Sequence, residues 1–321
     1  MTTMQLVRRM LFLLIGGCVA GCSGLAYAQS GHAKAHDAKA AGAAATMPAE
    51  YQKAMDYLGK KGDYQDHVLK LNVPRTDLAM TVGGIKLPTP FGFGGWVAMT
   101  PGAGGHQVLM GDLVLLPEEV NPVLSALLDH GLEVTALHNH FFYEHPRLAY
   151  MHVHGHGTAM ELAERVKPAL DLIGHVVPLP AAGEGRALPS TPALDTAALT
   201  RIVGHAGEQF GPVYKIIIGR SDLHVREMGA LINARMGLNT WAAFAGSNDE
   251  AAIAGDIAML SSEVQPVLKA LRSHGLEVVS IHNHMIGTAP AIYFLHYWGT
   301  GPAEKLAAGF KAAVAELGRK R

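Results

Sequence analysis

The order of apolar and polar residues predicts one series of strands and helices that occurs twice in the chain. In the second occurrence, apolar runs at 215–218 and 251–260 have the length and composition of strands. A helix is predicted at 263–274, because Pro266 lies near its start, where a missing N–H is tolerated, and Gly275 follows its end as a cap.

Further elements extend this series. They are predicted strands at 276–284 and 291–298, predicted helices at 195–205 and 303–317, and strands at 67–71 and 107–116 in the first occurrence. A looser β region with several glycines, leading to Trp241 or Trp96, adds a strand between the first two. The resulting order is close to αβββαββα. Because a short loop joins the last two strands, they are expected to pair as antiparallel neighbours. We therefore predict an α+β fold with mainly antiparallel sheets and flanking helices.

An internal duplication explains why the series occurs twice. Residues 119–140 return as residues 263–284, and about 15 of the 22 positions are identical. The repeats are predicted at 48–178 and 193–319, joined by a linker at 179–192 that is rich in Pro, Gly and Ser. Repeats of this length can each form a core, so we expect two homologous units related by a pseudo-twofold axis.

The first 28 residues are predicted to be a signal peptide. Arg8 and Arg9 precede an apolar run at 10–19, which is too short to cross a bilayer. Cleavage before Cys22, at the end of a lipobox-like sequence, competes with cleavage after Ala28. We favour the lipobox, because Cys22 is otherwise an unexplained thiol. The protein is therefore expected to be exported, to the periplasm or as a lipoprotein whose contact with the membrane is an anchor at Cys22.

The remaining composition narrows the function. Residues 29–47 form a predicted low-complexity tether, and the whole sequence is 49% hydrophobic and 17% charged, as in a globular protein. A formal net charge of −1 gives no electrostatic reason to bind nucleic acid. No cysteine follows Cys22, which excludes cysteine nucleophiles and cysteine zinc ligands from the predicted repeats.

Histidines at strand spacing are the strongest candidates for chemistry. Side chains two residues apart share one face of a strand, so Leu132, Val134, Ala136, His138 and His140 are expected to lie together. On the next strand, Tyr150, His152, His154 and His156 share a face, with His154 expected near His138. The predicted metal ligands are His138, His140, His152, His154 and His156 in the first repeat, and His282, His284 and His296 in the second.

Three or four imidazoles around one ion are typical of zinc, and imidazole also binds copper and iron. We therefore predict a divalent transition metal, zinc above copper or iron. Asp112 and Asp256 are predicted to orient the histidines through hydrogen bonds. Glu144 is the candidate general base, although Gly and Thr residues occupy the matching loop of the second repeat.

Other repeated polar residues have structural explanations. Asp77 and Asp222 each follow an arginine by two residues, and we expect them to pair with it. Asn139 lies between the first two histidines and is expected to satisfy backbone groups.

The two histidine segments, 131–157 and 275–301, resemble the LppY/LpqO family. In both, His-Asn-His is followed by a proline and then a third histidine. The family consists of bacterial envelope proteins built around a domain of unknown function, and it is named after mycobacterial lipoproteins. The resemblance supports the lipobox at Cys22 and implies no particular activity or substrate.

Three hypotheses follow. The protein is a metal-dependent enzyme acting on an unidentified small molecule, a protein that binds metal or a small ligand without turnover, or a fold in which the histidines form a structural network. The asymmetry between the repeats and the position of Glu144 favour catalysis. The lack of a carboxylate common to both repeats beside the histidines favours binding.

Overall fold

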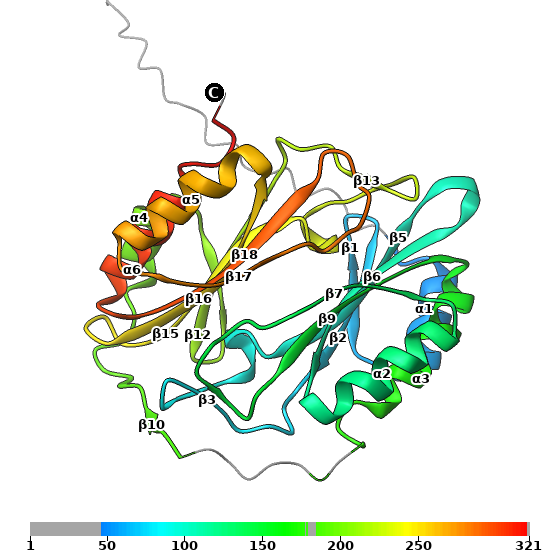
Figure 1. The fold of residues 1–321 in the computed structure, drawn as a ribbon, viewed down its shortest axis with the longest axis horizontal. Coiled ribbons are helices and arrows are strands. Elements are labelled where there is room, and N and C mark those ends of the chain that lie inside the picture. The colour runs from blue at the N-terminus through cyan, green and yellow to red at the C-terminus, as the bar shows by residue number, and fades with distance from the viewer. Residues whose placement is uncertain (1–45, 177, 179–183, 320–321) are drawn as a thin grey trace, which may run out of the picture. The chain divides into compact units, whose positions relative to one another are not determined.

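Two six-stranded antiparallel sheets, one from each repeat, lie at the centre of this computed structural model (Figure 1). The model describes residues 46–176, 178 and 184–319. The strand orders are β1-β2-β5-β6-β9-β7 and β11-β12-β15-β16-β18-β17, so the two sheets have the same topology. The predicted α+β class with two homologous repeats is confirmed. The predicted signal peptide and nearly all of the tether lie outside the described residues.

The first repeat contains three long helices and nine strands among the described residues. Their bounds are α1 (Ala49–Leu58), β1 (Gly62–Gln65), β2 (Val68–Pro74), β3 (Met80–Val82), β4 (Ile85–Leu87), η1 (Thr89–Phe91), β5 (Gly94–Pro101), η2 (Ala103–Gly105), β6 (Gln107–Leu115), α2 (Pro117–Asp129), β7 (Glu133–His138), β8 (Glu144–His145), β9 (Ala149–Gly157) and α3 (Ala159–Leu172).

After the short strand β10 (Arg186–Ala187), the second repeat follows the order of the first among the described residues, except that it has no counterpart of η2 or β8. Its elements are α4 (Thr196–Val203), β11 (Gly207–Phe210), β12 (Val213–Gly219), β13 (Arg226–Glu227), β14 (Ala230–Leu231), η3 (Ala234–Met236), β15 (Asn239–Gly246), β16 (Ala251–Leu260), α5 (Ser261–Ser273), β17 (Glu277–His282), β18 (Ile292–Gly301) and α6 (Ala303–Val314). None of the helices in the described ranges has the length and apolar content that a membrane crossing needs.

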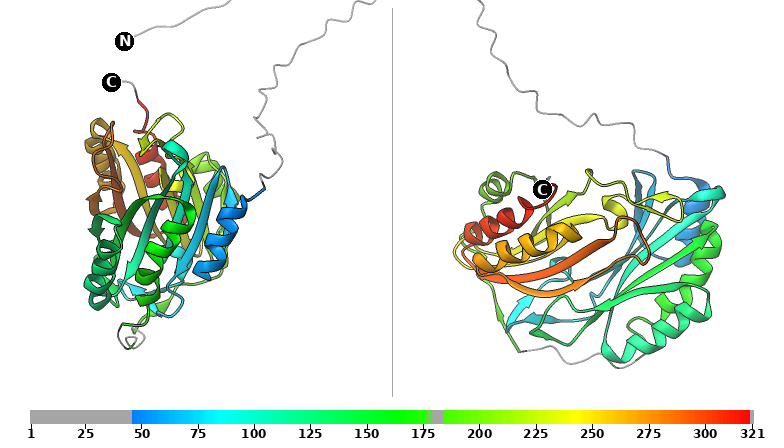
Figure 2. Two further views of the ribbon diagram at one scale, coloured as in Figure 1. Left: turned by 90° about the vertical axis from the view of Figure 1, so that its right-hand side faces the viewer. Right: turned by 45° about the horizontal axis from the view of Figure 1, so that its top comes forward.

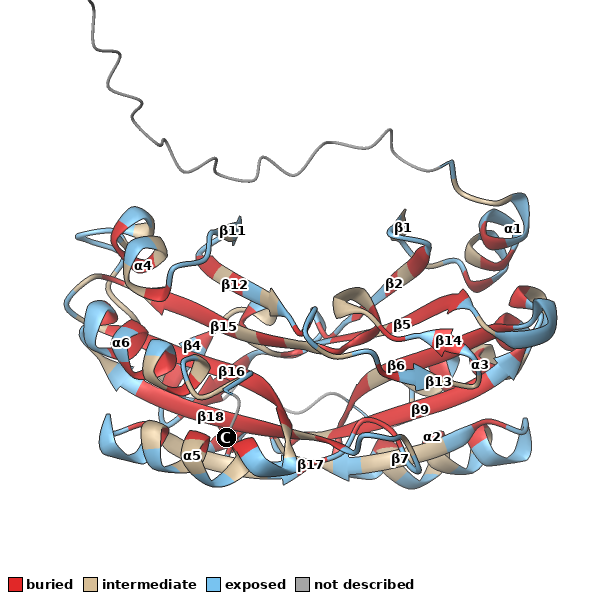
Figure 3. Cartoon of the chain, turned by 90° about the horizontal axis from the view of Figure 1, so that it is seen from above, coloured by how far each residue is buried: buried red, intermediate tan, exposed pale blue. Residues whose placement is uncertain are grey.

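Helices cover one face of each sheet. In the first repeat α1, α2 and α3 pack on it, and in the second α4, α5 and α6 do so (Figures 1 and 2). Alternate residues of the strands, such as Leu71, Met99 and Leu109, point into this layer and are buried. Figure 3 shows the resulting burial along the central strands of both sheets. Burial of these apolar side chains supplies the main drive to fold each repeat.

The other face of each sheet is covered by the other repeat. Between β2 and β5 the chain leaves the first sheet as β3, β4 and η1, and its Phe91 shares a core with Ala243 and Trp298 of the second repeat. Between β12 and β15 the second repeat makes the matching excursion, and Met236 packs with Met110 of the first. Each repeat therefore completes the core of its partner, which the sequence did not predict.

A buried arginine fixes the start of α2. Arg75 contacts Glu119, with 2.6 Å between Nη1 and Oε2, and also pairs with Asp77. Glu119 Oε2 in turn accepts a hydrogen bond from the N–H of Leu116, one of the donors left free at a helix N-terminus. Arg220, Asp222 and Glu263 repeat this arrangement at α5. The predicted pairing of both aspartates with arginine is confirmed.

The segment predicted as a linker also contributes to the fold. Its residues 186–187 form β10, which pairs in parallel with β4 of the first repeat. Strand propensity at two residues is too weak to be recognised in a segment rich in Pro, Gly and Ser, so this pairing was missed.

Candidate functional site

A β-bulge decides where the histidine strand points. The register of β7 against β9 shifts between Val134 and Ala136. Such a bulge inserts one residue and reverses the alternation of side chains beyond it. Leu132 and Val134 therefore pack on the helix side, whereas His138 faces the second repeat, where it stacks on His282. The prediction that all five alternate residues of this segment share a face was wrong.

The predicted hairpin register was also wrong. His138 pairs with Tyr150, and His154 pairs with Glu133 at the far end of β7. The reason is that the chain between β7 and β9 forms β8, which pairs with β3, so the connection is not a tight hairpin loop. His138 and His152 remain on one face, because His152 pairs with Ala136, two residues from His138.

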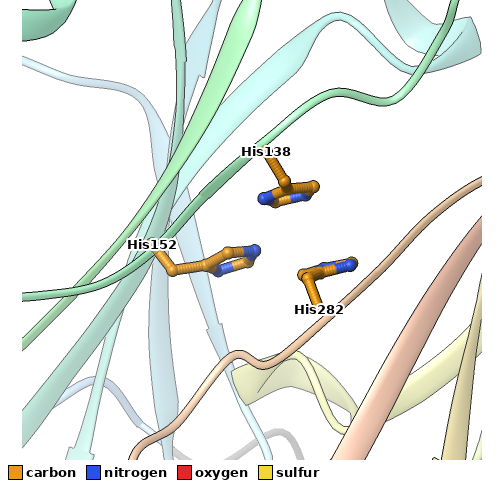
Figure 4. A group of neighbouring side chains, drawn as sticks. All are labelled: His138, His152 and His282. Carbon is orange, nitrogen blue, oxygen red and sulfur yellow. The ribbon is translucent and has the colours of Figure 1, made fainter.

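Six histidines meet between the two sheets and form what we call the histidine centre. They are His138, His140, His152, His282, His284 and His296. His138 and its counterpart His282 stack with ring centroids 3.7 Å apart. Figure 4 shows these two rings with His152 beside them. Because equivalent residues of the two repeats touch here, the centre lies on the axis that relates them.

Ring nitrogens from different repeats approach one another closely. His138 Nε2 lies 3.3 Å from His296 Nε2. The rings of His140 and His296 are 3.6 Å apart, and those of His152 and His284 are 4.0 Å apart. The third histidine of each repeat therefore lies against the His-Asn-His segment of the other repeat.

Three groups of side chains have ligand atoms within 4.8 Å of one another. They are His138, His152 and His282; His138, His140 and His296; and Asp256, His282 and His296. Two of the three groups take members from both repeats. The centre is thus one shared site, and neither repeat supplies those two groups alone.

Hydrogen bonds across the repeats hold the histidine segments. Thr135 Oγ1 donates to the carbonyl of His284 at 2.7 Å, and Ser280 Oγ donates to the carbonyl of Asn139 at 3.0 Å. The amide of Asn139 donates to the carbonyl of Leu148 at 2.6 Å, so its predicted backbone role is confirmed. These contacts fix the backbone of each segment against the opposite sheet.

Aromatic rings support the second histidine of each segment. His140 stacks on Tyr150, and His284 stacks on Phe294 at the matching position of β18. Both supporting rings are buried, and Tyr150 also donates a hydrogen bond to the carbonyl of Gly92. Stacking restricts the orientation of the imidazole and so preorganises its nitrogens.

Burial keeps the imidazoles of the centre neutral. It lowers the pKa of His138, His284 and His296 to about 3, and it holds the pKa of His140 and His152 well below 6.5. The pKa of His282 is lowered as well, first by burial and then by His296. A neutral imidazole has a lone pair free for a metal ion, whereas a protonated one does not.

Several nitrogens of the centre have no hydrogen-bond partner among the described residues. They include both ring nitrogens of His140 and of His282, Nδ1 of His138 and Nε2 of His152. Buried polar atoms are nearly always satisfied in proteins, and each one left unpaired costs about 1–3 kcal/mol. A set of unpaired, neutral and converging imidazoles fits a metal ion.

The predicted supporting aspartates lie beside the centre. Asp112 Oδ2 is 4.0 Å from His140 Nε2, and Asp256 Oδ2 is 3.5 Å from His284 Nε2. Burial raises the pKa of both carboxyls, and Asp256 raises that of Asp112 further. Their Oδ1 atoms are buried without a partner in the described part of the chain.

A pocket of about 510 Å³ opens onto the centre. Its lining combines residues of both repeats: Lys70, Asn72, Trp96, Asp112 and His140 from the first, and Lys215, Trp241, Asp256, His284 and His296 from the second. The two lysines and two tryptophans were not predicted to belong to the site. The sequence feature that could have identified them is the repetition, because each pair occupies matching positions in the two repeats.

Three predicted site residues lie elsewhere. His154 is buried with Nδ1 3.8 Å from Oε1 of Glu227, and His156 is exposed near His106. Glu144 accepts a hydrogen bond from the N–H of Leu148 and does not line the pocket. Burial raises the pKa of Glu144 to about 8. None of the three belongs to a group of converging ligand atoms, although His154 is near enough to the centre to lower the pKa of His152.

A family model supports the duplication, and other comparisons add little. The model described as Domain of Unknown Function (DUF1259) matches residues 52–172 and 197–316. No curated protein matches the sequence significantly. EtuB from Clostridium kluyveri is a similar solved structure, with 8% identity, TM-score 0.21 and coverage of 84% of this chain and 91% of that one.

Two microcompartment shell proteins are similar at the same level. The double ringed trimeric shell protein MSM0271 from the RMM microcompartment has 13% identity and TM-score 0.18, over 68% of this chain and 85% of its own. The trimeric shell protein PduB has 11% identity and TM-score 0.20, over 80% and 92%. At these TM-scores the likeness supports no conclusion. The two family matches do, and the chain belongs to the family described by Domain of Unknown Function (DUF1259), with two copies of its domain.

Proposed function

We propose that the histidine centre binds a divalent transition metal, zinc before copper or iron, and that the pocket beside it admits a small molecule that meets the metal. The observation that carries this proposal is the convergence of neutral, buried and unpaired imidazoles from both repeats. A structural network would instead leave few ring nitrogens without a hydrogen bond.

The spacing of the nitrogens supports a metal of this kind. Two nitrogens bonded at about 2.0–2.1 Å to one tetrahedral ion lie roughly 3.3–3.4 Å apart. The Nε2 atoms of His138 and His296 are 3.3 Å apart. The ligand atoms of each of the three groups lie within 4.8 Å of one another, so the rings would have to turn and approach further to share one ion. His138, His282 and His296 each belong to two of the groups. Both groups of His138 combine the two repeats, so the loss of this residue should matter most.

The pocket favours a site at which a ligand meets the metal. His140, His284 and His296 line it, so one side of the centre faces a cavity. A metal in such a site polarises a bound group or activates water. The side chains around it would orient the ligand and exclude bulk water. Asp112 and Asp256 are the carboxyls of the pocket and replace Glu144 as the groups best placed to accept a proton from a ligand.

Capture without turnover is the second candidate function. The pocket carboxyls lie within 4.0 Å of ring nitrogens of the centre, at His140 and His284. Carboxyls engaged in this way would orient the histidines and take no part in proton transfer. The same metal site serves both functions, and product formation from a bound ligand distinguishes them.

The cellular setting belongs to the same proposal. The charged start, the short apolar run and the lipobox at Cys22 support export to the periplasm or anchoring as a lipoprotein. The resemblance of both histidine segments to the LppY/LpqO family supports an envelope role. Labelling of the protein with a radioactive fatty acid in cells, compared with a Cys22→Ser variant, tests the anchor.

Metal analysis of the protein purified without a histidine tag tests the central proposal. We expect about one or two equivalents of a single metal, retained through dialysis, because the neutral ligands need not lose a proton to bind. In a His138→Ala variant the affinity should fall by more than the roughly 10–100-fold that loss of a supporting partner costs.

His154→Ala is the matched control. His154 is a buried histidine of the same sheet that lies outside the centre, so this variant should keep its metal. A folded parent protein that stays free of metal after incubation with zinc, copper and iron would overturn the proposal and leave the structural network.

A further inference from the structure

We propose that Lys70 and Lys215 form an oxyanion subsite in the pocket, which binds a carboxylate or phosphate group of the small molecule that reaches the histidine centre. The inference rests on the proposed function, because it assigns a ligand class to the same pocket. It comes from the two lysines, the tryptophans beneath them and the lack of a direct ion pair with either ammonium group among the described residues.

The two lysines occupy matching positions on central strands. Lys70 lies on β2 opposite Ala98, and Lys215 lies on β12 opposite Ala243. Both line the pocket, together with residues of the histidine centre. Two independent surface lysines would not be expected at matching positions that face one cavity. The repeats have thus placed two ammonium groups in one pocket.

A tryptophan holds each ammonium group. Lys70 Nζ lies 4.1 Å from the centre of the Trp96 ring, and Lys215 Nζ lies 4.0 Å from the Trp241 ring. A cation over an aromatic face is attracted to the ring, which fixes the head group without neutralising its charge. The positive charge therefore stays available to a ligand.

The ammonium groups are poorly satisfied by the protein. Lys70 Nζ donates to the carbonyl of Arg235 at 3.4 Å. Within the described residues neither Nζ forms an ion pair, and Lys215 has no hydrogen bond from its ammonium group. Asp112 and Asp256 are near enough to act on the charge of Lys215 without contacting it. Both lysines are half-buried, so their charges lose part of their hydration, and they have room for a partner in the pocket. An oxyanion between them would supply it.

The titration of the lysines agrees with this geometry. Burial, followed by the nearby charge of Lys215, lowers the pKa of Lys70 to about 8. Burial also lowers the pKa of Lys215 to about 8, although Asp112 and Asp256 oppose this. Both lysines are thus mainly charged at pH 7 and lose their charge as the pH rises through about 8.

The geometry selects a ligand of moderate size. A cavity of about 510 Å³ is in the usual range for small-molecule sites. A ligand with its acidic group between the lysines would have its other end toward His140, His284 and His296, which line the same cavity. Small organic acids and phosphate esters have this chemistry. Asp112 and Asp256 disfavour a second acidic group at that end.

Binding of succinate and of inorganic phosphate tests the inference, followed by calorimetry and by tryptophan fluorescence. The proteins are the parent, Lys70→Met, Lys215→Met and the double variant, each with and without zinc. Lys305→Met, which removes an exposed lysine of α6, is the control. Binding to the metal-free protein separates the lysines from direct coordination of the anion by zinc.

We expect at least one of the two anions to bind the metal-free parent and to perturb the fluorescence. Each single variant should weaken the association constant about tenfold or more, since a hydrogen bond to a charged group is lost. The double variant should not bind, the control should match the parent, and parent affinity should fall between pH 7 and pH 9.

Equal affinities of the parent and the double variant would overturn the inference, as would a folded parent that binds neither anion. Zinc content measured on the same samples keeps the two proposals apart. If the parent holds zinc and binds no anion, only the proposal of an oxyanion subsite is rejected. If the parent binds the anions through its lysines and takes up no metal, the subsite is supported and the proposal of a metal centre is rejected.

Discussion

At the scale of single residues, the histidine centre combines two properties that rarely occur together. Its imidazoles are buried deeply enough to stay neutral, and many of their nitrogens have no partner in the described residues. The protein tolerates this cost because both sheets and both aromatic supports hold the rings in place. Such a site is costly to maintain in the absence of a ligand and strongly stabilised by one.

The metal-free protein should lose stability in mild acid. The pKa of His138, His284 and His296 is about 3 in the folded state, against 6.5 for an exposed histidine. The unfolded chain therefore takes up more protons below pH 6.5, so the stability from neutral histidines is fully present above pH 6.5 and is lost as the pH falls toward 3. Each buried histidine contributes up to about 2 kcal/mol between pH 6.5 and pH 5.

Urea unfolding in the presence of a chelator, at pH 7.5 and pH 5.0, measures this loss. A His138→Gln variant should show a smaller difference between the two pH values, because one of the titrating groups is gone. The raised pKa values of Glu144, Asp112 and Asp256 stabilise the fold as the pH falls and oppose this loss, so the comparison with the variant carries the test. The same change in the free energy of unfolding for the parent and for His138→Gln would contradict the assignment of a neutral buried His138.

Part of the site could be predicted from the sequence, and the reason differs from residue to residue. His138, His140 and His152 and their three counterparts were found from repetition and strand spacing. Lys70 and Lys215 were missed, because a lysine in an apolar strand carries no signal until its neighbours in space are known. His154 has the spacing of a ligand, and only the register of β9 against β7 removes it from the centre.

At the scale of elements, strand and helix positions followed from the sequence where the hydrophobic pattern was long. The prediction for 251–260 coincides with β16, and that for 263–274 overlaps nearly all of α5. The bulge between Val134 and Ala136 was not predictable from alternation, because one inserted residue leaves the composition of the strand unchanged. The small strands β3, β4, β13 and β14 lie in the looser β regions expected before Trp96 and Trp241, but two or three residues give no periodicity that would resolve them individually.

The arginine networks at the starts of α2 and α5 should be essential to stability. An Arg75→Met variant leaves the carboxylate of Glu119 buried without its partner, which should cost about 3–5 kcal/mol. A double variant, Arg75→Met with Glu119→Gln, should recover part of the loss, since the unpaired charge is removed. Urea unfolding at pH 7.5 measures both.

Lys167→Met is the control for the arginine prediction. Lys167 pairs with Asp171 on the surface of α3, where the two side chains are 32% and 54% exposed. Exposed pairs contribute about 0–1 kcal/mol, so this variant should differ little from the parent. A similar effect of Arg75→Met and Lys167→Met would show that the buried network contributes no more than a surface pair.

At the scale of the whole described unit, the two repeats share two cores and one site. The excursions β3–β4 and β13–β14 pack into clusters that contain residues of both repeats. The sequence predicted two units with their own cores, which the clusters beneath the helices confirm. It did not predict that β3–β4 and β13–β14 pack against the opposite repeat, because apolar residues in short loops do not indicate which surface they cover.

A break in the connection between the repeats should therefore leave the site intact. A protease cleavage site introduced between residues 178 and 184, followed by cleavage of the purified protein, tests this prediction. The two fragments should elute together in gel filtration without denaturant and keep the metal content of the uncut protein, since both cores and two ligand groups span the repeats. Fragments that separate under native conditions would contradict a shared core.

The position of His138 against His282 has a consequence for the history of the chain. A homodimer of one such repeat would place the two copies of this residue face to face on its dyad, and every substitution in the histidine centre would then occur twice. Joining both copies in one polypeptide removes that constraint. Tyr150 and Phe294, or the loop with Glu144 and its glycine-containing counterpart, have since become different. A single chain can thus present two unlike walls to one asymmetric molecule, which a symmetric pair could not.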